Sequence, residues 1–413
     1  MLHDLIVSLW GESTYRVLAI LFRLYPLWLP LTLGIAFWQT WVRYVRWNFF
    51  VNTPTTLLEV RLPKEITKSP AAMELALHAL YQTGGESTVI AKYWEGKTRD
   101  WFSLEIASIG GEVRFYIWTR NRTRNIIEAY IYSHFGDVEI REVADYTKSV
   151  RFDPNVNNIW GTTYKKKLGD SYPIKTYVDY GLDKDPKEEL EHNPLFTLLE
   201  QFGSLKPQEN IWLQLVVRAH KKEKRRGFFS KAHDFSKDLE ERRKEFREGL
   251  EGRAVPTELE GKLINALERS VYKHAFDVGI RVLYVADKSA YSNTTITMLR
   301  NLFRPFGAEF SSDKNFPSFG RFNLLKPYAS RDTPDTDYPW EDFKNIRMNR
   351  KKRLLLDAYK RRMFFYAPYD ELYSVLTTEE LATLYHFPGS AATTPGLPRI
   401  QSKRATAPTN LPT

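Results

Sequence analysis

The chain has 413 residues, of which 43% are hydrophobic, and a net charge of +10 at neutral pH. This size and composition predict a globular protein with two or three domains. It contains no cysteine, which excludes disulfide frameworks, thiolate zinc sites and cysteine nucleophiles. We therefore expect most of the chain to face the reducing cytosol. The excess of Lys and Arg favours an anionic membrane leaflet or a nucleic acid as partner.

An apolar run near the N-terminus predicts a membrane anchor within residues 1–50. Leu24–Val42 (LYPLWLPLTLGIAFWQTWV) contains no charged side chain and is about as long as a bilayer-crossing helix. We therefore expect a transmembrane helix at about residues 24–42; a cleaved signal peptide and a buried core helix are the alternatives. Leu5–Phe22, which precedes it, suits a helix in the membrane interface. The anchor residues that we single out are Leu24, Trp28, Leu31, Phe37, Trp38, Trp41, Arg43 and Arg46.

Residues 51–150 show the order β-α-β-β-α-β, which is typical of a ferredoxin-like module. Alternating apolar residues predict the strands, helical spacing predicts the helices, and Gly110-Gly111 predicts a hairpin turn. The predicted elements are strand Thr56–Arg61, helix Pro70–Tyr81, strands Phe102–Ser108 and Val113–Thr119, helix Arg122–His134 and strand Asp137–Val143.

The same order returns in residues 170–312, which we interpret as a second ferredoxin-like module, interrupted by a charged helical insertion at about residues 221–274. The expected fold class is thus α+β. The predicted elements of this module are strand Ile174–Asp179, helix Pro194–Phe202, strand Ile211–Arg218, strand Gly279–Val285, helix Asn293–Phe306 and a short strand Ala308–Phe310.

Residues 340–388 are predicted to form a basic helical region, and residues 389–413 a flexible, linker-like tail rich in Pro, Ala, Thr and Ser. Between Lys344 and Arg362 there are nine Lys or Arg residues and one acidic residue, Asp357. Such a helix is a candidate for binding the phosphates of nucleic acid or of anionic lipid, although a solvated helix face is the alternative. The candidate binding residues are Arg347, Arg350, Lys351, Lys352, Arg353, Lys360, Arg361 and Arg362.

Motifs for catalysis are weak. Ala91–Thr98 (AKYWEGKT) matches the loose pattern of a nucleotide-binding loop, but glycine is absent from its first position, the loop carries the bulky Tyr93 and Trp94, and a predicted strand follows it where a phosphate cradle needs a helix N-terminus. The histidines show no metal-ligand spacing. We therefore expect no catalytic residue, no cofactor, no metal site and no enzymatic activity in this chain.

Near the C-terminus the sequence contains Leu376–Gly389 (LTTEELATLYHFPG), followed by TPGLPR, SKRA and APTNLP. This C-terminal sequence resembles the segment that precedes the motor domain in bacterial type IV secretion or conjugative coupling-type ATPases. In that family a membrane-anchored region with α+β modules precedes a nucleotide-binding core. No phosphate-loop or magnesium-binding position of the family has a match in this sequence, so the resemblance implies a part without the ATPase core.

From these patterns we expect a membrane-anchored, non-catalytic scaffold or docking subunit of a type IV secretion or conjugative DNA-transfer machine. The alternative is a membrane-tethered nucleic-acid-binding protein that uses the basic helix. The expected location is the inner, cytoplasmic membrane, with a single pass and the bulk of the chain in the cytoplasm. The expected partners are the lipid bilayer, a motor ATPase or secretion-channel components, and DNA; homo-oligomerisation is left open.

Overall fold

The computed structural model describes residues 20, 22–64, 68–84, 88–184, 193–221, 235–250, 258–307, 322–328, 346–389 and 396–400. The chain divides into two compact units. Residues 1–53 and 84–98 form the first unit, and residues 54–83 and 99–413 form the second.

The first unit contains the long helix α2 (Tyr25–Asn52) and the short helix α4 (Val89–Tyr93). The two helices meet through aromatic side chains. The indole Nε1 of Trp41 donates to the carbonyl oxygen of Tyr93 at 3.1 Å, and the ring of Trp38 lies 5.4 Å from that of Tyr93. Thr88 caps α4 by accepting a hydrogen bond from the amide of Ala91.

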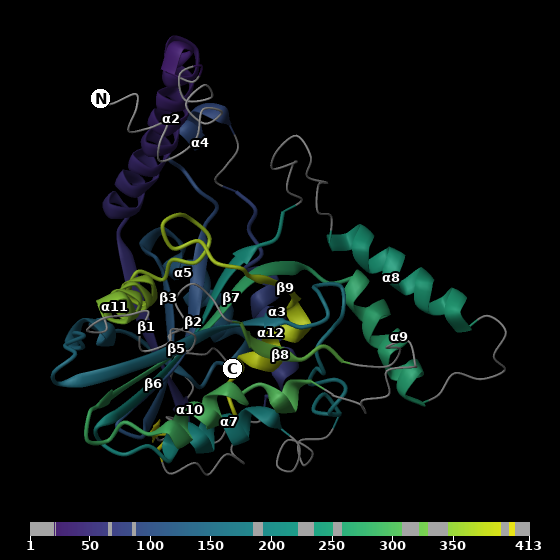
Figure 1. Cartoon of the computed structure of the whole chain (residues 1–413). Helices are drawn as coiled ribbons and strands as arrows, with labels where there is room; N and C mark the ends of the chain where they lie inside the picture. The colour runs from purple at the N-terminus through teal and green to yellow at the C-terminus, as the bar shows by residue number, and fades with distance from the viewer. Residues whose placement is uncertain are drawn as a thin grey trace, which may run out of the picture. The chain divides into compact units, whose positions relative to one another are not determined.

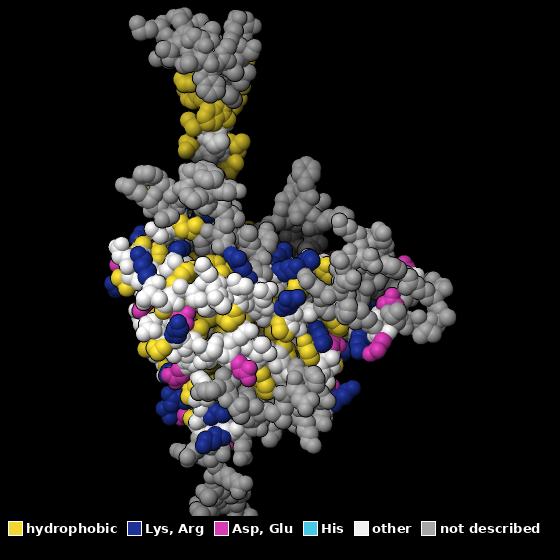
Figure 2. All heavy atoms as spheres, turned by 60° about the horizontal axis from the view of Figure 1, so that its bottom comes forward, with side chains coloured by type: hydrophobic (Ala, Val, Ile, Leu, Met, Phe, Trp, Pro, Cys, Tyr) yellow, Lys and Arg dark blue, Asp and Glu magenta, His cyan; other side chains and the backbone are white. Residues whose placement is uncertain are grey.

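The predicted transmembrane helix at residues 24–42 is wrong. Among the residues that the structure describes, no helix is both long enough and apolar enough to cross a bilayer. The physical reason lies in the composition of α2, in which Trp, Tyr, Pro, Gln and Thr alternate with the aliphatic residues and Arg43 and Arg46 follow within two turns. Of the predicted anchor residues, Trp41 and Arg46 are half-buried and the other six are exposed. Figure 2 shows the apolar side chains of α2 as a yellow column.

The second unit is built on a ten-stranded, mostly antiparallel sheet, so its fold class is α+β (Figure 1). Its strands are β1 (Thr55–Pro63), β2 (Trp101–Ile109), β3 (Glu112–Arg120), β4 (Glu139–Glu142), β5 (Asn157–Lys166), β6 (Glu209–Ala219), β7 (Ala275–Asp287), β8 (Leu325–Tyr328), β9 (Ser374–Thr377) and β10 (Arg399–Ile400). Its helices are α3 (Pro70–Ala79), α5 (Asn121–His134), α7 (Pro194–Gly203), α8 (Phe235–Leu250), α9 (Glu258–Val271), α10 (Asn293–Arg300), α11 (Ile346–Lys360) and α12 (Thr378–Leu384), with 3-10 turns η1 (Tyr146–Ser149) and η2 (Arg304–Phe306).

Within this sheet, two halves have the same strand order. The first half is ordered β4-β1-β3-β2 and the second β8-β5-β7-β6, which is the order of a ferredoxin-like split unit when each half is numbered by itself. Gly110 and Gly111, both with positive φ, form the β2–β3 turn. The helices α8 and α9 lie between β6 and β7, at the place of the predicted insertion.

The two halves join through equivalent strands. β2 pairs antiparallel with β6 along their whole length, from Trp101 opposite Arg218 to Ile109 opposite Asn210. The sheet therefore continues from one module into the other without a gap.

One face of the sheet is covered by α3, α5, α7, α10 and α12, which contribute Met73, Ile131, Leu199, Leu299 and Leu381 to a single apolar core. The strands present every second residue to this core. The other face carries residues such as Trp212 and Leu283, and there α11 contacts β5 and β7. The two faces thus have different coverings: a layer of helices lies over the core, and the opposite face carries the basic helix α11 together with η1 and the chain after α11.

The predicted strand Ile174–Asp179 is wrong, because the first strand of the second module is β5 at Asn157–Lys166. Side chains of α12 bind the backbone of the predicted strand. The amide of Ile174 donates to Glu380 Oε1 at 2.9 Å, and that of Tyr177 donates to Thr383 Oγ1 at 3.0 Å. These amides are therefore satisfied without a neighbouring strand. The predicted strand Ala308–Phe310 lies outside the described residues.

The segment that carries the family resemblance is part of the folded core. β9 pairs with β7, and α12 begins with a capping box in which Thr377 and Glu380 bond each other's backbone amides. Leu381, Leu384 and Tyr385 are fully buried. Residues 396–400, predicted to lie in the flexible tail, include β10, which pairs parallel with the end of β1.

Candidate nucleic-acid interface

The basic helix α11 is held to the sheet by its C-terminal half. Leu355, Leu356 and Tyr359 are buried, and the Leu355 side chain fills the space above Gly161 of β5, where a Cβ would lie 2.6 Å from it. The Tyr359 ring packs 5.4 Å from that of Trp212 on β6. The C-terminal half of α11 is thus fixed on the sheet by one apolar face.

Of the eight predicted binding residues, four are exposed: Arg347, Arg350, Arg353 and Arg361. The first three recur every three residues, so they lie close together on the outer surface of the N-terminal half. Ile346 and Leu354 are exposed beside them. Arg361 is placed differently, since its Nε donates to Asp357 at 2.9 Å, one turn earlier. Arg347, Arg350 and Arg353 therefore form the arginine face of α11.

Three lysines of the predicted set are half-buried: Lys351, Lys352 and Lys360. Lys352 Nζ donates to Asn158 Oδ1 at 2.5 Å, and Lys360 Nζ donates to the carbonyl oxygen of Val150 at 2.5 Å. Burial lowers the pKa of both ammonium groups. These two lysines tie α11 to Val150, at the end of η1, and to Asn158, at the start of β5, so this part of the chain and the helix form one surface.

Arg362 lies away from solvent, in an ionic network under the helix. Its Nε donates to Glu105 Oε1 at 2.9 Å, and its Nη1 and Nη2 donate to Asp145. Burial acts to lower the pKa of Arg362, but Glu105 and Asp145 raise it well above its ordinary value. Tyr146 and Gln214 complete the network by donating to Glu105 at 2.8 and 2.9 Å. Arg362 thus fixes the end of α11 and is not accessible to phosphate.

The fold brings further cations to this surface that the sequence analysis missed. Lys148 in η1 and Arg151 in the connection from η1 to β5 are exposed. Arg151 lies near enough to Lys360 for its charge to add to the effect of burial in lowering the lysine pKa. These residues belong to no basic run and stand at the predicted end of the first module. Only the contact of Lys360 with Val150 reveals them as neighbours of α11.

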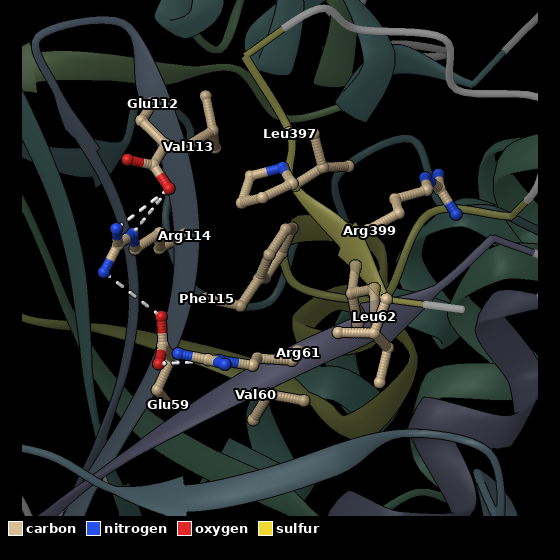
Figure 3. Close-up of a pocket in the computed structure, with 12 residues that line it drawn as sticks. Glu59, Val60, Arg61, Leu62, Glu112, Val113, Arg114, Phe115, Leu397 and Arg399 are labelled. Atoms are coloured by element: carbon tan, nitrogen blue, oxygen red, sulfur yellow. Dashed lines mark hydrogen bonds and ion pairs between the residues drawn. The ribbon is translucent and has the colours of Figure 1, made fainter. Parts of the chain in front are cut away.

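A separate cavity of about 220 Å³ opens where β1 and β3 diverge, beyond Val60 and Phe115, and β10 enters between them. Figure 3 shows Arg61 and Arg114 on its wall bonded to carboxylates. Arg114 donates to Glu112 at 2.9 Å and to Glu59 at 3.4 Å, and Arg61 donates to Glu59 at 3.1 Å. The third arginine of the lining, Arg399, donates to the carbonyl oxygens of Pro63 and Gly389 at 3.0 and 2.7 Å.

Within the described ranges, no three His, Asp or Glu side chains are grouped closely enough to hold a metal ion. Comparison with known proteins adds no assignment: no family model matches this sequence, and no curated protein matches it. The function must therefore be inferred from the residues themselves.

Proposed function

We propose that this protein is a non-catalytic nucleic-acid-binding platform, in which the arginine face of α11 contacts the phosphates. The observation that carries the proposal is the exposure of Arg347, Arg350 and Arg353 on a helix whose other end is buried in the sheet domain. A helix held in this way presents its cations without a large loss of conformational entropy on binding.

The neighbouring charges support the same proposal. Lys148 and Arg151 add exposed cations on a second segment of the chain, which contacts α11 at Lys360, and cations from two segments can follow a phosphate backbone better than one helix face alone. The exposed Ile346 and Leu354 add apolar contact area for sugars or bases. Arginine suits this role because its planar guanidinium can bond two phosphate oxygens at once.

The test is binding of labelled DNA strands of about 20 nucleotides, single-stranded and duplex, measured by fluorescence anisotropy between about 50 and 300 mM salt. The variant is Arg347→Gln/Arg350→Gln/Arg353→Gln. The slope of log K against log salt is negative, and each lost phosphate contact reduces its magnitude by about one. We therefore expect the magnitude of the slope to decrease by about two to three in the variant. Affinity at low salt should fall at least about tenfold.

A matched control is Lys206→Gln/Arg300→Gln/Arg304→Gln, which removes the same charge from exposed positions near α7 and α10. This control should bind like the natural sequence. Equal losses in both variants would mean that only net charge matters, and unchanged binding in the α11 variant would refute the assignment of the interface.

A second candidate function is docking to a motor ATPase of a type IV secretion or conjugative DNA-transfer machine. The favouring observation is that the premotor-like segment is anchored in the core: His386, for example, is buried between α12 and the Asn193 side chain that caps α7. A segment fixed in this way would hold a following or partner motor in a defined orientation to the sheet domain.

This second candidate is tested by chemical cross-linking of the tagged protein in its native cells, followed by purification and mass spectrometry. Recovery of a phosphate-loop ATPase cross-linked to residues near the C-terminus supports docking. Repeated recovery of the cross-linked protein without any ATPase or secretion-channel component contradicts it.

A further inference from the structure

A polar cleft of about 340 Å³ lies beside α11, at the end of the sheet where β5 and β6 begin and β7 ends. It is lined by Ser149, Val150, Arg151, Asn157, Gln208, Asn210, Val285, Ala286 and Asp287. Its volume falls at the lower end of the range for small-ligand pockets, about 300–1,000 Å³. Since Val150 also accepts the hydrogen bond of Lys360, the cleft and α11 share a wall.

Strand pairing places polar side chains in rows across the floor of the cleft. Asn157 of β5 is opposite Asp287 of β7, and the amide of Asp287 donates to the carbonyl oxygen of Gln208. One step inward, Asn210 is opposite Val285. Asn210 is followed along the same face of β6 by Trp212 and Gln214, which contact Tyr359 of α11. The cleft is therefore the part of this sheet face that α11 leaves open.

The side chains of Arg151, Gln208, Asn210 and Asp287 make no hydrogen bond to one another or to any other described residue, so their donors and acceptors are available to a ligand. Amides can bond the edge of adenine, a carboxylate can accept from the exocyclic amine of cytosine, and arginine can bond guanine. The Asp287 carboxylate repels a phosphate. The cleft therefore suits the base of a nucleotide better than its phosphate.

We propose that the cleft binds an unpaired nucleobase of a single-stranded nucleic acid whose backbone lies on the arginine face of α11. This inference rests on the proposed function and deepens it: the arginines hold the backbone, while the cleft selects single strands over duplex. A base within a duplex has its pairing edge occupied and cannot enter. Because the Asp287 carboxylate can accept from an exocyclic amine, which thymine lacks, adenine and cytosine should bind better than thymine.

The experiment uses the full chain and the anisotropy assay described above, with the variant Gln208→Ala/Asn210→Ala. We expect about a tenfold loss of affinity for a single strand of adenine and cytosine, with unchanged affinity for duplex and an unchanged salt slope. The matched control is Gln82→Ala/Asn301→Ala, which removes two amides from other parts of the same unit and should change nothing. Circular dichroism checks that the variants are folded.

A second measurement does not depend on variants. A single strand with a photoreactive thiobase should cross-link to the natural protein at residues 149–157, 208–210 or 285–287. Cross-links only elsewhere overturn the proposal, as does equal competition by a strand that lacks bases. Free mononucleotides test whether the cleft takes a base from a strand or from a single nucleotide. If mononucleotides bind the cleft and displace the single strand at equal concentration, the cleft is a nucleotide site. The single-strand proposal is then overturned.

Failure of this inference is distinguishable from failure of the proposed function. If no DNA binds in a manner that depends on Arg347, Arg350 and Arg353, the proposed function fails. If DNA binds in that manner but the cleft variant keeps the full preference for single strands, only the cleft proposal fails.

Discussion

Protonation of His386 should make the protein unstable in acid. The imidazole is fully buried; its Nδ1 lies 3.0 Å from the carbonyl oxygen of Ala382, and its Nε2 lies 2.8 Å from Asn193 Nδ2. The carbonyl requires a proton on Nδ1, so Nε2 accepts from the Asn193 amide and the ring is neutral. A second proton on the ring, at Nε2, would point at Asn193 Nδ2, which is itself a hydrogen-bond donor. Burial accordingly lowers the pKa of His386 from 6.5 to about 4.

The sign and size of the effect follow from this pKa. Below about pH 6.5 the unfolded chain takes up a proton on this histidine, whereas the folded protein does so only near pH 4. Stability from this group is therefore complete above about pH 6.5 and is lost as the pH falls toward 4. At about 1.4 kcal/mol for each pH unit, the free energy of unfolding should drop by roughly 3 kcal/mol.

Urea unfolding, followed by circular dichroism between about pH 7 and pH 4, measures this loss. His386→Gln removes the titrating group, so the stability difference between natural protein and variant should shrink by roughly 3 kcal/mol over that range. Asn193→Asp is a sharper comparison. An aspartate still caps α7, and its carboxylate accepts a hydrogen bond from the protonated Nε2 of His386, so the acid sensitivity should disappear. A constant difference between the natural protein and His386→Gln at every pH would refute the reasoning.

Three further predictions concern stability and are checked by chemical unfolding. Arg362→Met should cost about 3–5 kcal/mol because it leaves Glu105 buried without its cation, whereas adding Glu105→Gln to that variant should restore part of the loss. Gly161→Ala should cost about 1–3 kcal/mol, since a Cβ there would lie 2.8 Å from the carbonyl oxygen of Val282, and an unchanged midpoint would contradict the packing described for α11. Thr377→Ala removes the cap of α12 and should cost about 1 kcal/mol, with Thr377→Ser close to neutral.

Much of the sheet could be predicted because its strands follow simple local rules. In the first module, strict alternation and the Gly110-Gly111 turn identify β2 and β3 to within about one residue. The helices α3 and α7 begin with proline at the expected first-turn positions. Such signals lie within a few residues of the element that they specify, and the sequence displays them directly.

Prediction from the sequence fails where contacts between residues far apart in the chain determine the structure. Ile174–Asp179 alternates like a strand, yet Glu380 and Thr383, some two hundred positions later, bond its backbone. The length of the run from Leu24 to Val42 and its lack of charged side chains predict a bilayer-crossing helix; that error is a local one, because Trp, Tyr, Pro, Gln and Thr make α2 less apolar than a membrane span.

The candidate site was predictable in composition but not in geometry. The basic run from Lys344 to Arg362 identified α11, but charge alone cannot distinguish the exposed Arg350 from the buried Arg362. That difference depends on Glu105 and Asp145, which are remote in sequence. The polar cleft was missed for a similar reason, because its residues come from η1 and the chain that follows it and from the ends of β5, β6 and β7, which become adjacent only when the sheet forms.

The junction of β2 with β6 has a consequence for how such a molecule could have arisen. Because equivalent strands of the two halves pair antiparallel, a single ancestral half could have paired with its own copy across a two-fold axis. Fusing two copies into one chain makes the association independent of concentration. Fusion also frees the two halves to diverge, so that one could acquire the helices α8 and α9. The other could keep β4 (Glu139–Glu142), a short, charged outer strand that discourages pairing with a third copy.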